Sequence, residues 1–314
     1  MADRGRLWRL TKLTLGTAIA VLALYFLVSR LVHDWRQIPF SELRFNIGYL
    51  VASYIILLAL HFPLGALTWR LLLRGLDETI AFRKCLAIIT VTQLGKYAPG
   101  KVWFTLGRMS LARAAGISEA KTLVSVVVET GFLLLSAILL FGIAVLLLPR
   151  VLVPKAVYLL FLLVPLCLVV VYPGVLNRLL GFALARLKQP GFALRLSYHR
   201  LLGILGLYTL DWSVQGTGCF LLINSFYPLP LAKLPVMLGA YALSWILGFI
   251  ILIAPAGLGI REGIFTFVLK LIMAPPMAII AALLTRVWMT TSEALMALVC
   301  LPLLGKWRQD GTET

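Results

Sequence analysis

The sequence predicts an all-α protein: a polytopic helical membrane bundle of about six to eight spanning helices that includes two broken or re-entrant helical segments. Hydrophobic residues make up 61% of the 314 positions and charged residues only 13%, which is more apolar surface than a soluble core buries. The apolar residues also form runs long enough to cross a hydrocarbon core of ~30 Å, which takes about 20 helical residues. Lipid is therefore the expected solvent.

The uninterrupted apolar runs set the predicted domain organisation. A basic stretch at 1–12 precedes the first run, which lacks a small-residue cleavage pattern and is therefore expected to stay as an uncleaved span. We expect a cytoplasmic N-terminus at 1–12, one transmembrane domain at 13–303 and a short cytoplasmic tail at 304–314. The runs occupy roughly 13–32, 47–73, 121–148, 156–177, 200–227 and 277–303.

Lys and Arg are distributed unevenly over the segments between these runs. They gather before the first run, between 70 and 84, and in the predicted loop at 178–200, whereas loops 33–46, 149–155 and 228–233 carry few. The positive-inside rule then places the basic segments and both termini in the cytoplasm. The net charge of +17 accordingly fits anionic lipid headgroups, and no nucleic-acid partner is expected.

Two regions, about 85–116 and 234–275, consist of shorter apolar pieces broken by Pro and Gly. The predicted orientation requires the first region to enter and return on one side, and the second to turn back near 254–262. Paired broken segments in corresponding halves are typical of transporters built from an inverted repeat, which is a further expectation here. The alternative is that Pro and Gly only kink ordinary membrane helices.

The first break has the residues of a phosphate site. Pro99 and Gly100 predict a tight turn between two short helices. Lys96, Lys101 and Arg108 lie around it, where cations and helical N–H groups could bind a substrate phosphate. The alternative is that these cations only anchor the loop to anionic headgroups.

The second break is a glycine-rich turn formed by Pro255, Gly257 and Gly259. Arg261 follows it and can offer a planar fork to a phosphodiester. Glu262 can neutralise Arg261 locally or take a proton. The alternative is a turn with a merely local ion pair.

Other charged groups lie inside apolar runs, where each costs ~2.5–3.5 kcal/mol on an insertion scale and must face protein or water. Glu129 and Glu293 are candidates for proton coupling or ion pairing, and Arg286 for substrate binding. Because Arg286 and Glu293 share a helical face, they either line one cavity or each pair with another helix. His61, ahead of Pro63, is expected to form a hydrogen bond within the bundle.

Enzyme signatures are absent from the sequence: it contains no phosphate-binding loop of the GxxxxGK type, no HExxH, no GxSxG and no metal-spaced histidine cluster. We therefore expect no catalytic residues, no cofactor, no metal and no enzymatic activity.

The strings Tyr97-Ala98-Pro99-Gly100-Lys101-Val102, with Arg108 downstream, and Pro255-Ala256-Gly257-Leu258-Gly259-Ile260-Arg261-Glu262 resemble the flippase-like lysylphosphatidylglycerol synthase transmembrane family. The resemblance covers nearly the whole chain. It implies a lipid-like substrate and a bacterial or archaeal inner membrane. In the best understood members, this domain is taken to move aminoacylated phosphatidylglycerol and is fused to a cytoplasmic aminoacyl transferase, which does not fit here, so a stand-alone member is expected.

Two residues depart from the family pattern. Thr130 follows Glu129 where many relatives have Arg, and Ala256 replaces a glycine of the usual turn. Either change could alter the substrate or the ability to translocate it.

The leading hypothesis is a transporter that moves an anionic phospholipid or a lipid-linked glycan. Lys101, Arg108 and Arg261 would bind the phosphate, and Glu129 or Glu262 would couple movement to protons. The second is a membrane enzyme or accessory subunit of a separately encoded transferase, and the third is a scaffold without a cavity. Membrane lipids are expected partners, and a separate transferase or a homo-oligomer remains open.

Overall fold

The computed structural model describes residues 44–97, 102–147, 163–186, 192–250 and 259–310, with the backbone alone from 305 to 310. Every regular element within these ranges is helical, which confirms the predicted fold class. The helices are α2 (Ile47–Ile56), η2 (Leu57–His61), α3 (Phe62–Gly75), α4 (Phe82–Gln93), η3 (Leu94–Tyr97), α5 (Trp103–Ala114), α6 (Glu119–Leu146), α7 (Leu163–Val171), α8 (Pro173–Arg186), α9 (Tyr198–Asn224), η6 (Leu231–Lys233), α10 (Leu234–Ile250), α11 (Ile260–Leu269) and α12 (Pro275–Asp310).

Four helical stretches of the described chain are long and apolar enough to cross a membrane: Ile47–Gly75, Glu119–Leu146, Leu231–Ile250 and Pro275–Leu304. Three of them match the predicted runs at 47–73, 121–148 and 277–303. Large apolar side chains on these helices, such as Leu60, Val287 and Leu298, are exposed on the protein surface. Such a surface suits a bilayer better than water, so the chain is a multi-pass membrane protein. The predicted span at 13–32 lies outside the described residues.

The first of these stretches contains one wide turn. Its five-residue π-helical turn, Leu57–His61, interrupts the α-helix just before Phe62 and Pro63. Pro63 has no N–H to donate to the preceding turn, and a π turn is one way in which a helix accommodates such a break. The turn brings His61 against α9, where its Nδ1 lies 2.7 Å from Oδ1 of Asp211. This confirms the expected hydrogen bond within the bundle.

The expected loop at 178–200 is wrong for the described residues, and the run predicted at 156–177 is bent where the structure describes it. α7 and α8 meet at Tyr172 with a bend of 81°, and α8 continues to Arg186. Pro173 explains the bend, because its ring clashes with the carbonyl four residues earlier and it lacks an N–H, yet it suits the first position of a new helix. Counted as one broken span, the pair raises the number of candidate spans to five.

α9 lies at the centre of the bundle, packed against α2, α3, α6 and α10. Trp212 on α9 is buried and donates its indole N–H to the carbonyl of Leu133 and to the hydroxyl of Ser136 on α6, each at 3.1 Å. α9 also carries the buried polar side chains of Asp211 and Gln215. A central position gives these groups protein partners instead of lipid.

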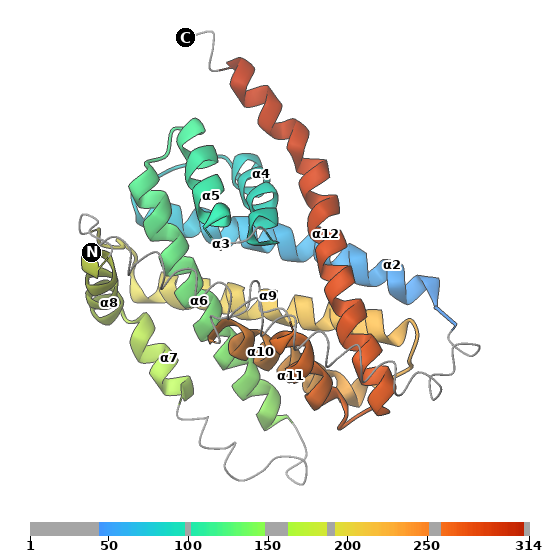
Figure 1. Cartoon of the computed structure of the whole chain (residues 1–314). Helices are drawn as coiled ribbons and strands as arrows, with labels where there is room; N and C mark the ends of the chain where they lie inside the picture. Colours follow the sequence, from blue (N-terminus) through green and yellow to red (C-terminus); the bar gives the residue numbers. More distant parts are fainter. Residues whose placement is uncertain (1–43, 98–101, 148–162, 187–191, 251–258, 311–314) are drawn as a thin grey trace, which may run out of the picture.

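Each predicted break lies between two short helices that pack against each other (Figure 1). We call α4–η3–α5 the first hairpin and α10–α11 the second hairpin. Gly95 marks the close approach in the first, because a Cβ there would lie 2.8 Å from the backbone N of Phe104. Gly248 marks the close approach in the second hairpin, because a Cβ added there would lie 3.3 Å from Cβ of Arg261. The side of the membrane to which each hairpin opens, and an inverted repeat, stay predictions.

α12 connects the two hairpins. It packs against α4 of the first hairpin and α11 of the second, and Figure 1 shows it as the long red helix that passes both. Residues of the first hairpin therefore meet residues of the second hairpin, far away in the sequence, along one helix. The candidate functional residues lie at this meeting point.

Candidate functional site

Glu293 on α12 ties the end of the first hairpin to the bundle. Its carboxylate forms an ion pair with Nζ of Lys96 and accepts a hydrogen bond of 2.8 Å from the Tyr97 hydroxyl. Tyr97 is also 3.0 Å from the Thr290 hydroxyl one turn earlier on α12. Glu293 is 1% exposed, so without these partners its charge would be costly to bury.

Glu262 ties the start of the second hairpin's return helix to the same face of α12. Gly259 caps α11 with a φ of +82°, a region that favours glycine, and its N–H donates to Oε2 of Glu262 at 2.6 Å. The other carboxylate oxygen, Oε1, lies 3.7 Å from Nε of Arg286. Glu262 therefore forms an ion pair, but with Arg286 of α12; the alternative of a local pair with Arg261 is not seen among the described residues.

The spacing of Arg286 and Glu293 left open whether they line one cavity or each pair with another helix. Each pairs with a different helix, Arg286 with Glu262 and Glu293 with Lys96. Arg286 also lines a cavity, whereas Glu293 does not. On this face of α12, Glu293 therefore binds the first hairpin and Arg286 binds the second, and a cavity lies between the two hairpins.

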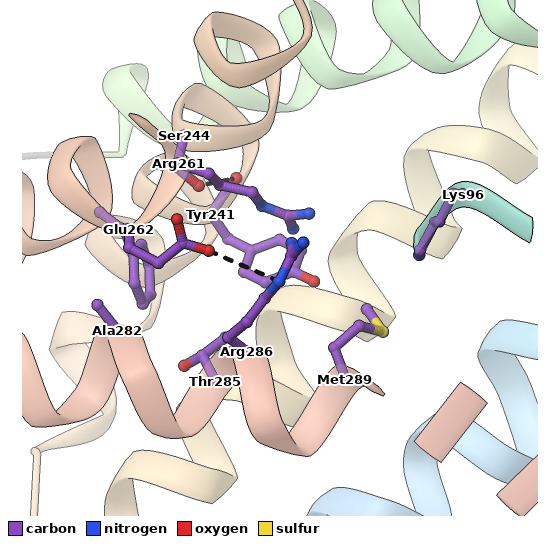
Figure 2. A pocket seen from close by; sticks show the side chains of 10 residues that line it. Lys96, Tyr241, Ser244, Arg261, Glu262, Ala282, Thr285, Arg286 and Met289 are labelled. Atoms are coloured by element: carbon purple, nitrogen blue, oxygen red, sulfur yellow. Dashed lines mark hydrogen bonds and ion pairs between the residues drawn. The ribbon is translucent and has the colours of Figure 1, made fainter. Parts of the chain in front are cut away.

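The cavity lies between the two hairpins and α12, has a volume of about 30 Å³ and is partly open to the outside. Its charged lining comprises the cations Lys96, Arg261 and Arg286 and the carboxylate of Glu262. Figure 2 shows the two guanidinium groups extending into the space from opposite walls, with Lys96 across from them. The remaining lining is formed by Tyr241, Ser244, Phe265, Ala282, Thr285 and Met289.

Aromatic rings support the two arginines. The Arg261 guanidinium lies over the ring of Tyr241, 5.1 Å from its centroid, and that of Arg286 over Tyr97 at 5.7 Å. Within the described part of the chain, Arg261 forms no ion pair with a carboxylate. A ring face stabilises a cation less than an anion does, so Arg261 keeps the capacity to bind an anion.

Arg108 and Glu129 do not line this cavity. Arg108 is 1% exposed, forms an ion pair with Glu129, and lies over the rings of Trp69 and Phe104 at 5.2 and 4.4 Å. This arrangement ties α5 to α6 inside the bundle. Glu129 therefore takes the ion-pair alternative, and the expected contact of Arg108 with a substrate stays a prediction.

Five predicted residues lie outside the described ranges: Lys101, Pro99, Gly100, Pro255 and Gly257. Their expected roles stay predictions.

Sequence reasoning gave no role to Tyr97, Tyr241 or Gln215. Tyr97 stands in the first motif, next to Lys96, so its position was a usable signal. Tyr241 and Gln215 lie in apolar runs with nothing around them that distinguishes them from core residues. In the structure the Tyr241 hydroxyl donates to Oε1 of Gln215 at 3.3 Å.

Comparison with known proteins gives one family. The family described as the lysylphosphatidylglycerol synthase TM region matches residues 13–292. No curated protein matches the chain. The matched range takes in both hairpins and Glu262, Arg286 and Lys96, but ends just before Glu293.

Proposed function

From the premise that the chain belongs to the lysylphosphatidylglycerol synthase transmembrane family, we propose that it moves an anionic phospholipid, or a lipid-linked glycan with a phosphate, across the inner membrane. The headgroup would pass through the cavity between the hairpins, while the acyl chains stay in the bilayer. Both termini would lie in the cytoplasm, as the distribution of Lys and Arg favours.

The observation that supports this proposal is the charge of the cavity. Its lining has three cations, of which Lys96 pairs with Glu293 and Arg286 with Glu262. Arg261 is left without an ion pair to any described carboxylate. Cations at membrane depth are costly unless an anion compensates them. A phosphodiester would supply the missing negative charge, and an arginine fork matches its paired oxygens.

The aromatic and apolar lining suits a lipid headgroup more than a free inorganic ion. Phe265, Ala282 and Met289 lie beside the charged groups, so the cavity offers apolar contact to the glycerol and first methylene groups next to the phosphate. A site for a strongly hydrated ion would instead be lined by polar groups throughout. The cavity therefore favours an amphiphile.

A translocation assay tests the proposal. Purified protein is reconstituted into liposomes that contain phosphatidylglycerol with a fluorescent headgroup, and a membrane-impermeant reductant measures how fast inner-leaflet lipid becomes accessible. Wild-type protein is expected to accelerate exchange. Arg261→Gln and Arg286→Gln are each expected to slow it about tenfold or more, because a charge-assisted hydrogen bond contributes about 1.5–3 kcal/mol.

Arg113→Gln is the matched control. Arg113 lies at the end of α5, where its exposed guanidinium pairs with Glu119 at 3.1 Å. It should leave exchange unchanged, since exposed ion pairs contribute little. Wild-type exchange that neither cavity variant slows would contradict the proposal.

A further inference from the structure

A chain of buried polar side chains leads from the cavity wall to a histidine on the other side of α9. The Tyr241 hydroxyl donates to Gln215, and Nε2 of Gln215 donates to Oδ2 of Asp211 at 3.0 Å. The second oxygen of Asp211 lies 2.7 Å from Nδ1 of His61. Asp211, Gln215 and Tyr241 are all buried, whereas His61 is partly open, with 17% of its side chain exposed.

The cavity end of this chain is Arg261. Its guanidinium lies over the ring of Tyr241, the residue at which the chain ends. His61 and Asp211 contact each other directly, and neither of them lines the cavity. Yet three consecutive hydrogen bonds and one cation–π contact connect His61 to Arg261.

We infer that His61 and Asp211 form a proton-binding pair linked to the anion cavity, which rests on the proposed function. With neutral imidazole the pair carries one negative charge, and with one bound proton it carries none. Charges interact strongly inside an apolar bundle, and polarised hydrogen bonds transmit part of that effect. The charged pair therefore partly offsets the positive charge at Arg261, and the protonated pair does not.

The consequence is that the anion and a proton bind together. An anion in the cavity favours the protonated pair, and by linkage the protonated pair favours the anion by the same factor. Histidine is suited to this role because its proton exchange falls near neutral pH.

The other titratable groups around Asp211 lie on α9 itself and on the helices packed around it. On α9, Tyr208 is buried and its hydroxyl has no hydrogen-bond partner among the described residues, while Arg108 and Glu129 of α5 and α6 pair with each other. On α2, Tyr54 bonds Thr291 of α12 at 2.8 Å. On α12, Arg286 and Glu293 pair with Glu262 and Lys96. His61 on η2 is therefore the titratable side chain whose ring nitrogen faces Asp211, at 2.7 Å.

The test measures binding of a water-soluble, short-chain phosphatidylglycerol to the purified full chain in detergent at about pH 5.5 and pH 8, on either side of an ordinary histidine pKa. Wild type is expected to bind at least about fivefold more tightly at the lower pH. In weakly buffered solution at pH 7, a pH-indicator dye should also report proton uptake as the lipid binds. His61→Gln should bind the lipid with the pH dependence and the proton uptake both lost.

His199→Gln is the control, because His199 is an exposed histidine in the first turn of the same helix α9. It should keep wild-type pH dependence and proton uptake. Gln215→Leu keeps the pair but breaks its connection to Tyr241, so it should reduce the pH dependence without abolishing binding. Thermal melting of each variant verifies that it is folded.

The outcomes separate this inference from the proposed function. If wild type binds the lipid equally at both pH values without proton uptake, or if His61→Gln keeps the wild-type pH dependence, the linked proton site is overturned while the anion cavity stands. If wild type binds no anionic lipid at either pH, the proposed function itself fails, and the inference fails with it.

Discussion

Charged side chains in the apolar bundle are arranged as pairs across helices, and each pair joins two elements. Lys96 with Glu293 joins the first hairpin to α12, and Arg286 with Glu262 joins α12 to the second hairpin. Burial makes such pairs costly to break, because removing one partner leaves an uncompensated charge. Arg261 forms no such pair within the part of the chain that the structure describes; it lies against a ring and faces the cavity.

Sequence alone predicts which residues carry these charges but not how they pair. A charge inside an apolar run is visible by its cost, so Glu129, Arg286 and Glu293 could all be singled out. Their partners could not be identified, because Lys96 and Glu293 are 197 residues apart and only the packing of α4 against α12 brings them together. Glu262, the carboxylate nearest to Arg261 in sequence, pairs with Arg286 of α12 instead, 24 positions further along the chain.

The buried Arg108–Glu129 pair should contribute strongly to stability. Arg108→Leu leaves Glu129 buried without its cation, so we expect the free energy of unfolding to fall by about 3–5 kcal/mol. The double variant Arg108→Leu with Glu129→Leu should lose much less, because an apolar pair removes both charges. Unfolding in detergent, followed by circular dichroism, measures both; a double variant as unstable as the single one would contradict this account.

At the scale of elements, the helices on either side of each predicted break pack closely against each other, with close contacts at Gly95 and Gly248. The Pro and Gly positions predicted where the chain would break, because Pro lacks a donor and glycine permits positive φ. Gly259, at +82°, starts α11 in this way. The α7–α8 bend was missed because only Pro173 signals it, and α8 was taken for a loop because its basic residues suggested a cytoplasmic segment.

Gly95→Ala tests the first hairpin. The added methyl group would lie 2.8 Å from the backbone N of Phe104, so η3 and α5 must separate. We expect a lower melting temperature and weaker binding of anionic lipid, since Lys96 and Tyr97 follow directly and would move away from Glu293.

Gly131→Ala is the control for that change. Gly131 lies within α6 with no atom within 4 Å of an added Cβ, so alanine should be neutral or stabilise the helix by about 0.5–1 kcal/mol. Equal melting temperatures for the two variants would show that the close approach at Gly95 is not required.

Over the whole molecule, α12 is the element that assembles the site. It packs against both hairpins, and its face carries the pairing groups and part of the cavity wall. The sequence predicted the helix and its two charged positions, but not that one helix would contact both breaks. That arrangement depends on side-chain packing over the whole bundle, for which the sequence has no local pattern.

The most direct test of the central claim is whether the cavity retains an anionic phospholipid. Purified protein is equilibrated with equal amounts of phosphatidylglycerol and zwitterionic phosphatidylcholine, and retained lipid is identified by native mass spectrometry. Wild type and Arg113→Gln should retain phosphatidylglycerol preferentially, whereas the double variant Arg261→Gln with Arg286→Gln should lose the preference. Equal retention of phosphatidylglycerol by wild type and the double variant would contradict an anion site between the hairpins.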